Sequence, residues 1–181
     1  EFFKSGSYRP RNSEHTHVTS SPSMDISKAS NFERFVFDLL GRDSVQVASL
    51  WQQVASGEGF DLSAELPRIR DTFGFMSGSS RHADRLATIR AVHASDGEWL
   101  DPHTADGVKV ARELREAGET VVCLETALAA KFADTISEAA GHEVHPPRPA
   151  ALTGLENLSQ HVTVLPNSAA AVKSLIEQVL A

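Results

Sequence analysis

The sequence predicts an α/β fold, namely the carboxyl-terminal part of an open, mostly parallel sheet flanked by helices, with a mainly helical segment before it. Two apolar, β-branched runs, at 120–126 and 161–165, support this because each is followed by an amphipathic helix. Buried strands that alternate with helices pair in parallel through right-handed crossovers. Two strands are too few for such a sheet, so the fold is incomplete on its own. We expect the missing strands from an upstream segment or from another copy of the chain.

The chain divides by composition into three segments. Residues 1–29 are expected to be a connecting strand or loop, because Ser, Thr, Pro, Arg and His dominate there. Residues 30–98 are expected to be mainly helical, and residues 99–181 to form the α/β part. The first residue is Glu1 rather than methionine, which suggests that the chain starts inside a larger protein.

Capping signals place the helices. Ser30 and Glu33 have the spacing of a capping box at the start of a helix. Asp101 is placed to cap a later helix with Pro102 at its first position, and this helix should close at Gly118. Further helices are expected at 44–55, 62–73 and 80–95.

Composition and charge exclude several functions. The chain has 181 residues, of which 41% are hydrophobic and 23% charged, as in a globular domain. Its net charge of -7 opposes nucleic-acid binding. Every apolar run is shorter than the roughly 20 residues that cross a bilayer, and the start lacks a secretion signal. The single cysteine, Cys123, suits a reducing compartment. We therefore expect a cytoplasmic protein with no nucleic-acid or membrane partner.

A few side chains are candidates for ligand binding. Thr126 ends the first expected strand, where ligands bind in open parallel sheets. Its hydroxyl can hydrogen-bond a ligand ring nitrogen, although capping the next helix is the simpler role. His103 lies at a helix start, which attracts anions. Asn31 and Arg34 could reach a phosphate, although a solvated arginine beside a capping box is the simpler reading. The eight histidines form no recognisable ligand pattern, so no metal is expected.

Three stretches carry a family resemblance. They are Ser21-Pro-Ser-Met-Asp-Ile26 with the following 30–40, Asp101-Pro-His-Thr-Ala105, and Thr126-Ala with Ala130-Lys-Phe132. In order and spacing these stretches resemble the threonine synthases of bacteria and fungi. The likeness covers nearly the whole chain, including the opening Phe-Phe-Lys-Ser-Gly. Within the third stretch, Leu128-Ala129 stands where the family has His-Pro, and Glu125 before it stands where a small residue is common.

The resemblance implies a pyridoxal 5'-phosphate enzyme of the tryptophan-synthase β-type fold, a lyase that converts O-phosphohomoserine and water into threonine and phosphate. Thr126 matches the position that faces the cofactor ring nitrogen, and Asn31, Arg34 and His103 are weaker candidates on the substrate side. Neither the family's Schiff-base lysine motif nor its glycine-rich phosphate loop occurs in the chain. The resemblance therefore implies a carboxyl-terminal part that is inactive without the amino-terminal part of the same protein.

Two alternatives stay open. One is another eliminating pyridoxal-phosphate lyase such as a threonine dehydratase, against which the stretches at 30–34 and 101–105 argue. The other is a catalytically silent interaction or folding module derived from such a lyase.

Overall fold

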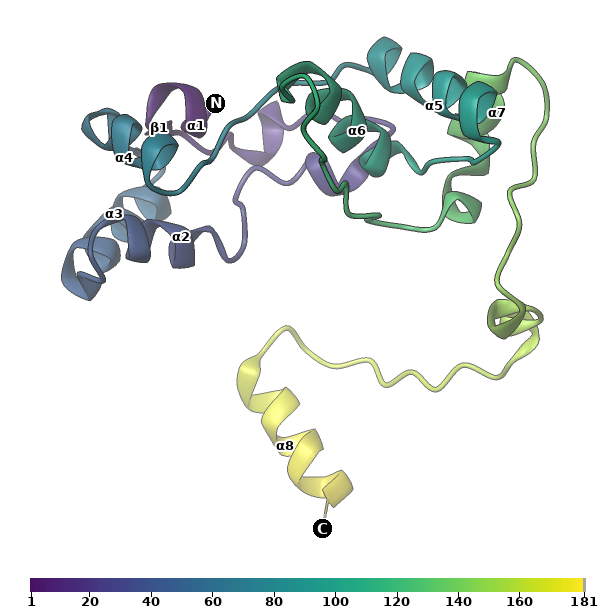
Figure 1. The fold of residues 1–181 in the computed structure, drawn as a ribbon. Coiled ribbons are helices and arrows are strands. Elements are labelled where there is room, and N and C mark those ends of the chain that lie inside the picture. Colours follow the sequence, from purple (N-terminus) through teal and green to yellow (C-terminus); the bar gives the residue numbers. More distant parts are fainter. Residues whose placement is uncertain (181) are drawn as a thin grey trace. The chain divides into compact units, whose positions relative to one another are not determined.

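The computed structural model describes residues 1–180, so residue 181, the end of the predicted 99–181 segment, lies outside the described part. The chain is mainly helical, with about 54% of its residues in helices and 2% in strands. It divides into a first unit, Glu1–Pro147, and a second unit that begins at Arg148 (Figure 1). Within residues 1–180, none of the helices combines the length and the apolar character needed to cross a bilayer.

Short helices make up most of the first unit. Two-residue strands and single 3₁₀ turns connect them, and the longest elements are α3, α5 and α6 (Figure 1). The helices are α1 (Phe2–Ser5), α2 (Phe32–Leu39), α3 (Ser44–Ser56), α4 (Leu66–Asp71), α5 (His82–Asp96), α6 (Pro102–Leu114) and α7 (Ala133–Ala140), and the strands are β1 (Ser7–Tyr8) and β2 (Phe60–Asp61).

The predicted parallel sheet is wrong. The segments 120–126 and 161–165 have no regular secondary structure. The sheet found within residues 1–180 is a two-stranded antiparallel one, in which β1 pairs with β2. A strand needs a neighbour that satisfies its backbone hydrogen bonds, and neither run has one among the described residues. Their apolar side chains are left in solvent, with Val122 78%, Leu124 83% and Val164 90% exposed.

The predicted helices at 44–55 and 80–95 are confirmed as α3 and α5. α3 begins after Asp43, whose carboxylate accepts hydrogen bonds from the N–H groups of Val45 and Gln46. The predicted helix at 62–73 is a 3₁₀ turn, Ser63–Glu65, followed by α4. Helices after both apolar runs are also present, as α7 and as α8 of the second unit.

Two predicted helix ends are wrong. The N-cap of α2 is Asn31, with a φ of 66° and no side-chain capping bond, so the predicted capping box of Ser30 and Glu33 does not form. Asparagine is one of the few residues that tolerates this left-handed conformation. α6 begins after Asp101 as predicted but ends at Leu114, where Arg115 takes an extended conformation. The predicted end, Gly118, lies in a separate turn closed by the hydrogen bond from the Glu119 N–H to the Glu116 carbonyl.

One hydrophobic core lies between α1, α2, α3 and α4. Leu39 of α2 and Ile69 of α4 are fully buried in it. The ring of Phe2 packs edge-on against that of Phe32, with ring centroids 4.9 Å apart. Aromatic pairs in this arrangement add to the stabilisation that burial alone gives. Helices α2, α3 and α4 thus enclose the apolar start of the chain.

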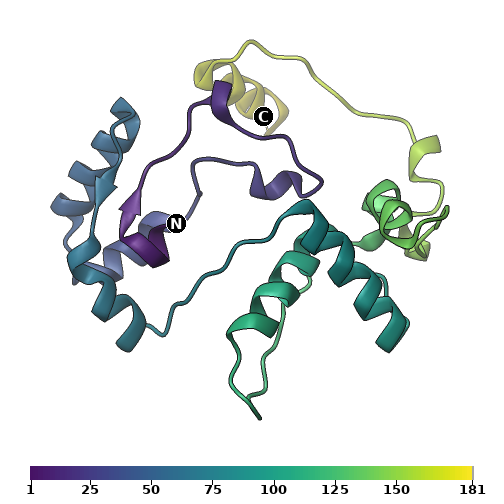
Figure 2. The ribbon, with the colours of Figure 1, turned by 90° about the horizontal axis from the view of Figure 1, so that it is seen from above.

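A second core lies between α5, α6 and α7. Ile89 of α5, Ala105 of α6 and Ala139 of α7 are almost fully buried there, and α5 and α6 lie side by side in both views (Figure 2). The small side chain of Ala105 lets the two helices approach closely at their contact. Residues 72–81 join the two cores without regular structure.

The second unit contains α8 (Ala169–Leu180) and two 3₁₀ turns, Ala150–Leu152 and Leu155–Asn157. One stripe of α8 is apolar, with Val172, Ile176 and Val179 on it. These side chains are 46%, 52% and 74% exposed, so the apolar stripe of the helix is largely open.

Gly6 should tolerate no side chain. It ends α1 with a φ of 76°, and a Cβ there would lie 2.3 Å from the Cα of Ser63. Gly141 ends α7 with a φ of 77° and nothing within 4 Å of a Cβ. Alanine strains the left-handed backbone at both positions by about 1–2 kcal/mol, but only Gly6→Ala adds a backbone clash. It should lower the free energy of unfolding by at least ~1 kcal/mol more than Gly141→Ala in chemical denaturation. Equal losses would contradict this close approach.

Acid should weaken the β1–β2 pair through Asp61. The hydroxyls of Ser63 and Ser7 and the Ser63 N–H donate to its carboxylate and lower its pKa from 3.8 to about 2. Because the folded pKa is the lower one, the stabilisation is complete above about pH 4 and is lost as the pH falls toward 2. Asp61→Asn should therefore reduce the drop in unfolding free energy between neutral pH and pH 2. Ser7→Ala should give a smaller change in the same direction, and an unchanged pH profile in both variants would refute the assignment.

Candidate functional site

Thr126 lies between α6 and α7, and its backbone is held by α6. Its N–H donates to the hydroxyl of Thr104 at 2.9 Å, and the N–H of Ala127 donates to Asp101 Oδ2 at 3.4 Å. The side chain of Thr126 is exposed, and among the described residues its hydroxyl has no hydrogen-bond partner. The N-cap of the next 3₁₀ turn is Leu128, not Thr126. The hydroxyl is thus free to bind a ligand while its backbone is anchored.

Asp101 is the N-cap of α6 and is fully buried. Its Oδ1 accepts hydrogen bonds from the N–H of His103 at 2.9 Å and from the His103 ring nitrogen Nδ1 at 2.8 Å. Its Oδ2 accepts from the Thr104 hydroxyl as well as from Ala127. The carboxylate thus does more than cap the helix, because it also connects to the segment that carries Thr126.

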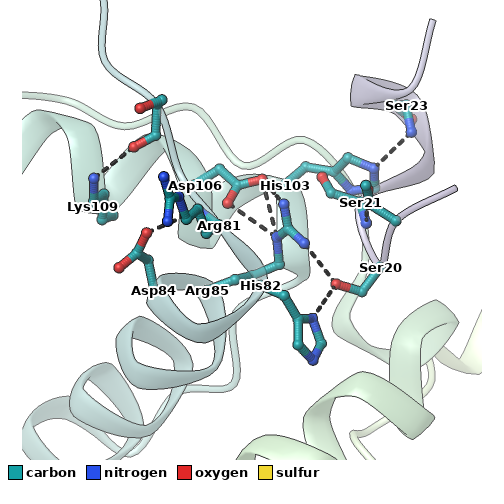
Figure 3. Close-up of polar contacts among 12 residues, drawn as sticks. Ser20, Ser21, Ser23, Arg81, His82, Asp84, Arg85, His103, Asp106 and Lys109 are labelled. Atoms are coloured by element: carbon teal, nitrogen blue, oxygen red, sulfur yellow. Dashed lines mark hydrogen bonds and ion pairs between the residues drawn. The ribbon is translucent and has the colours of Figure 1, made fainter. Parts of the chain in front are cut away.

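His103 bridges two segments that are far apart in the sequence. Its side chain is 2% exposed, and its Nε2 accepts the N–H of Ser23 at 3.1 Å (Figure 3). A backbone N–H can only donate, so Nε2 carries no proton, and the proton on Nδ1 is donated to Asp101. Both ring nitrogens are therefore occupied, and the ring packs edge-on against Phe132 with centroids 5.1 Å apart.

The other two predicted site residues lie at the start of α2. Asn31 and Arg34 are both exposed, and within residues 1–180 neither side chain is engaged in a hydrogen bond or ion pair. The hydrogen-bond network brings His103 and Thr126 together, whereas no bond of this network reaches Asn31 or Arg34. The left-handed backbone of Asn31 is a form of local strain that is often found near functional sites.

A buried ion pair lies close to His103 and was not predicted from the sequence. Arg85 of α5 donates to both carboxylate oxygens of Asp106 of α6 at 2.9 to 3.1 Å, with side chains 4% and 8% exposed. It also donates to the Ser20 hydroxyl at 2.6 Å (Figure 3). Because arginine can only donate, the Ser20 hydroxyl accepts from Arg85 and donates its own proton to His82 Nδ1 at 2.9 Å. The other ring nitrogen of His82, Nε2, lies 2.8 Å from the Glu138 carboxylate. No sequence signal marks such a pair, because its members are 21 positions apart.

A cleft of about 930 Å³ opens beside this ion pair. Thr126, His103, Asn31 and Arg34 do not line it. Within residues 1–180, no group of three or more His, Cys, Asp or Glu side chains is arranged to hold a metal ion. Polar residues from distant parts of the first unit meet in the lining, among them Arg9, Arg11, Ser27, Ser80, Arg85 and Asp106.

Breaking the buried ion pair should be costly. Asp106→Asn leaves Arg85 charged and buried without its counter-ion, which should lower the free energy of unfolding by about 3–5 kcal/mol. The exposed pair of Arg42 and Asp38, with side chains 75% and 49% exposed, supplies the control. Asp38→Asn should cost no more than about 0.5 kcal/mol. Similar losses in the two variants, measured by urea denaturation, would show that burial does not decide the strength of the pair.

Comparison with known proteins points to one family. Residues 104–176 match the family described as threonine synthase, C-terminal. The chain is 56% identical to threonine synthase of Methylobacillus glycogenes, an alignment of 97% of this chain and 37% of that protein. It is 50% identical to threonine synthase of Corynebacterium glutamicum, over 100% of this chain and 38% of that protein.

A solved structure agrees with these relatives. The X-ray structure of PLP-bound threonine synthase from Brucella melitensis matches with a TM-score of 0.80 and 39% identity, over 98% of this chain and 37% of that one. The chain thus spans little more than a third of the length of the relatives it matches. It belongs to the threonine synthase family and corresponds to the carboxyl-terminal part of such a protein.

Proposed function

We propose that the complete protein is a threonine synthase that uses pyridoxal 5'-phosphate to convert O-phosphohomoserine and water into threonine and phosphate, in threonine biosynthesis in the cytoplasm. The relatives that align with nearly the whole chain are named threonine synthase, and the Brucella relative is described as PLP-bound. The observation that carries the proposal is the free, exposed hydroxyl of Thr126 on an anchored backbone.

The surroundings of Thr126 fit a pyridine nitrogen. A threonine hydroxyl donates a hydrogen bond to an unprotonated ring nitrogen, whereas a carboxylate in the same place would hold the nitrogen protonated. Because the Thr126 N–H is already bonded to Thr104, the hydroxyl can turn toward a ligand without losing its backbone anchor. Pyridoxal phosphate, when bound, supplies the electron sink that makes the substrate's carbon–hydrogen bonds acidic.

Asn31 and Arg34 are proposed to contact the substrate. The guanidinium of Arg34 is exposed and has no partner among residues 1–180, and arginine suits bidentate contacts with a phosphate. The Asn31 amide offers both a donor and an acceptor. For His103, a direct contact with the substrate would require the loss of its bond to Ser23 or Asp101. We therefore propose that His103 acts through these two neighbours.

The remaining part of the protein is the proposed partner of this chain. Val122, Leu124 and Val164 are 78%, 83% and 90% exposed, and exposed apolar side chains in continuous runs mark surfaces that another chain or segment covers. We propose that the amino-terminal part of the same protein covers them, and that the chain alone is inactive. The same exposed runs, each in its own unit, would also serve a catalytically silent interaction module, which is the second candidate function.

Replacing Thr126 tests the proposed cofactor contact. In the full-length protein, Thr126→Val should weaken pyridoxal phosphate binding by roughly tenfold, because one hydrogen bond of about 1.4 kcal/mol is lost. Threonine formation from O-phosphohomoserine should fall as well. Thr120→Val, an exposed threonine in the same irregular segment, is the matched control and should bind the cofactor as the unchanged protein does.

The two measurements separate the candidates. Cofactor affinity that is unaffected by Thr126→Val would reject the role of Thr126. Full-length protein that binds pyridoxal phosphate but releases neither threonine nor phosphate from O-phosphohomoserine would reject the synthase. Protein that does not bind the cofactor at all would favour the silent interaction module.

A further inference from the structure

We propose that Asp101 and Thr104 are positioning residues that fix the backbone of Thr126, and that Asp101 couples this backbone, through His103, to the segment containing Ser23. The inference rests on the proposed cofactor contact of Thr126, which it deepens. Neither Asp101 nor Thr104 need touch the cofactor in this role. Their part is to set where the Thr126 hydroxyl is presented.

The Thr104 hydroxyl has a fixed hydrogen-bond direction. It accepts the N–H of Thr126 at 2.9 Å, since a backbone N–H can only donate. Its one proton is then donated to Asp101 Oδ2. Thr104 is 5% and Asp101 0% exposed, so water does not compete for these bonds. An anchor with a single possible arrangement holds the Thr126 backbone in one place.

Helix capping alone does not explain Asp101. Asp43 caps α3 from an exposed position with two bonds to backbone N–H groups of its own helix. Asp101 is fully buried, which costs far more in desolvation, and its Oδ2 is directed to Thr104 and Ala127 instead. The two Oδ2 bonds serve the segment at 126–127, one directly through the Ala127 N–H and one through Thr104. We infer from these bonds that the buried Asp101 carboxylate serves to place that segment.

The other carboxylate oxygen controls a second segment. Asp101 Oδ1 holds the His103 ring through Nδ1, which leaves Nε2 to accept the N–H of Ser23 at 3.1 Å. Ser23 belongs to the 3₁₀ turn Pro22–Met24. One carboxylate therefore sets the separation between this turn and Thr126. A change at Asp101 would release both, whereas a change at Thr104 would release only Thr126.

Amide hydrogen exchange tests the anchor directly. In the full-length protein, Thr104→Val keeps the shape of the side chain but removes the acceptor of the Thr126 N–H. The Thr126 amide should then exchange at least roughly tenfold faster, while that of Ser23 should not change. Thr104→Ser restores the hydroxyl and should return the Thr126 rate to within about threefold of the original.

Thr88→Val is the matched control. Thr88 is 7% exposed and its hydroxyl donates to the Asp84 carbonyl within α5, so the variant removes a buried hydroxyl without touching the anchor. It should leave the Thr126 rate unchanged. An unchanged Thr126 rate in Thr104→Val, or an equal increase in Thr88→Val, would overturn the positioning role whatever happens to the cofactor.

A double-mutant cycle then connects the anchor to the cofactor. Thr104→Val should weaken pyridoxal phosphate binding by up to roughly tenfold, and the loss should vanish when Thr126 is already valine. Losses that multiply in the double variant would overturn the inference, because Thr104 would then act independently of Thr126. If Thr126→Val alone leaves cofactor affinity unchanged while the exchange result holds, the proposed cofactor contact fails and the backbone anchor stands.

Discussion

Two buried carboxylates, Asp101 at the N-cap of α6 and Asp106 within α6, organise the second core. A buried carboxylate is costly unless donors surround it, and here some of the donors come from other segments of the chain. Asp106 is satisfied by Arg85 of α5, and Asp101 by its own helix and by the segment at 126–127. The need to satisfy these two charges therefore determines which segments meet at α6.

The same constraint explains how the segment at 19–25 is held without regular structure of its own beyond one turn. Ser20 accepts from Arg85, and the N–H of Ser23 donates to His103 (Figure 3). Arg85 is oriented by the Asp106 carboxylate, and His103 by the Asp101 carboxylate. In contrast, the core around Phe2 and Leu39 is built from buried apolar side chains. The first unit thus combines one core of packed apolar side chains with a second core in which buried hydrogen bonds and an ion pair add to the apolar packing.

Local signals predicted local features. Asp101 followed by Pro102 predicted a helix start because both the capping side chain and the proline act within one turn. The ion pair of Arg85 and Asp106 could not be predicted, since its two members meet only after α5 and α6 have packed. The same reason explains the missed bond between Thr104 and Thr126. For Thr126 itself, its place at the end of an expected strand left a helix cap and a ligand contact open, and only the family resemblance favoured the ligand contact.

The wrong prediction of a sheet has a similar physical origin. β-branched composition at 120–126 measures how well side chains would pack on a pleated surface, but it does not supply the neighbouring strand that would complete the backbone hydrogen bonds. The capping box at Ser30 failed for a smaller reason, because Asn31 takes the left-handed conformation and becomes the N-cap itself. In both cases the sequence pattern was compatible with more than one backbone conformation.

The open apolar run at 121–124 also bears on how such a chain is produced in a cell. Side chains such as Val122 and Leu124 are attractive to chaperones and to other unfinished chains for as long as they stay uncovered. The yield of folded protein then depends on whether this run is covered faster than the chains aggregate. This yield is set by folding kinetics, and the stability of the folded core around α5 and α6 contributes little to it.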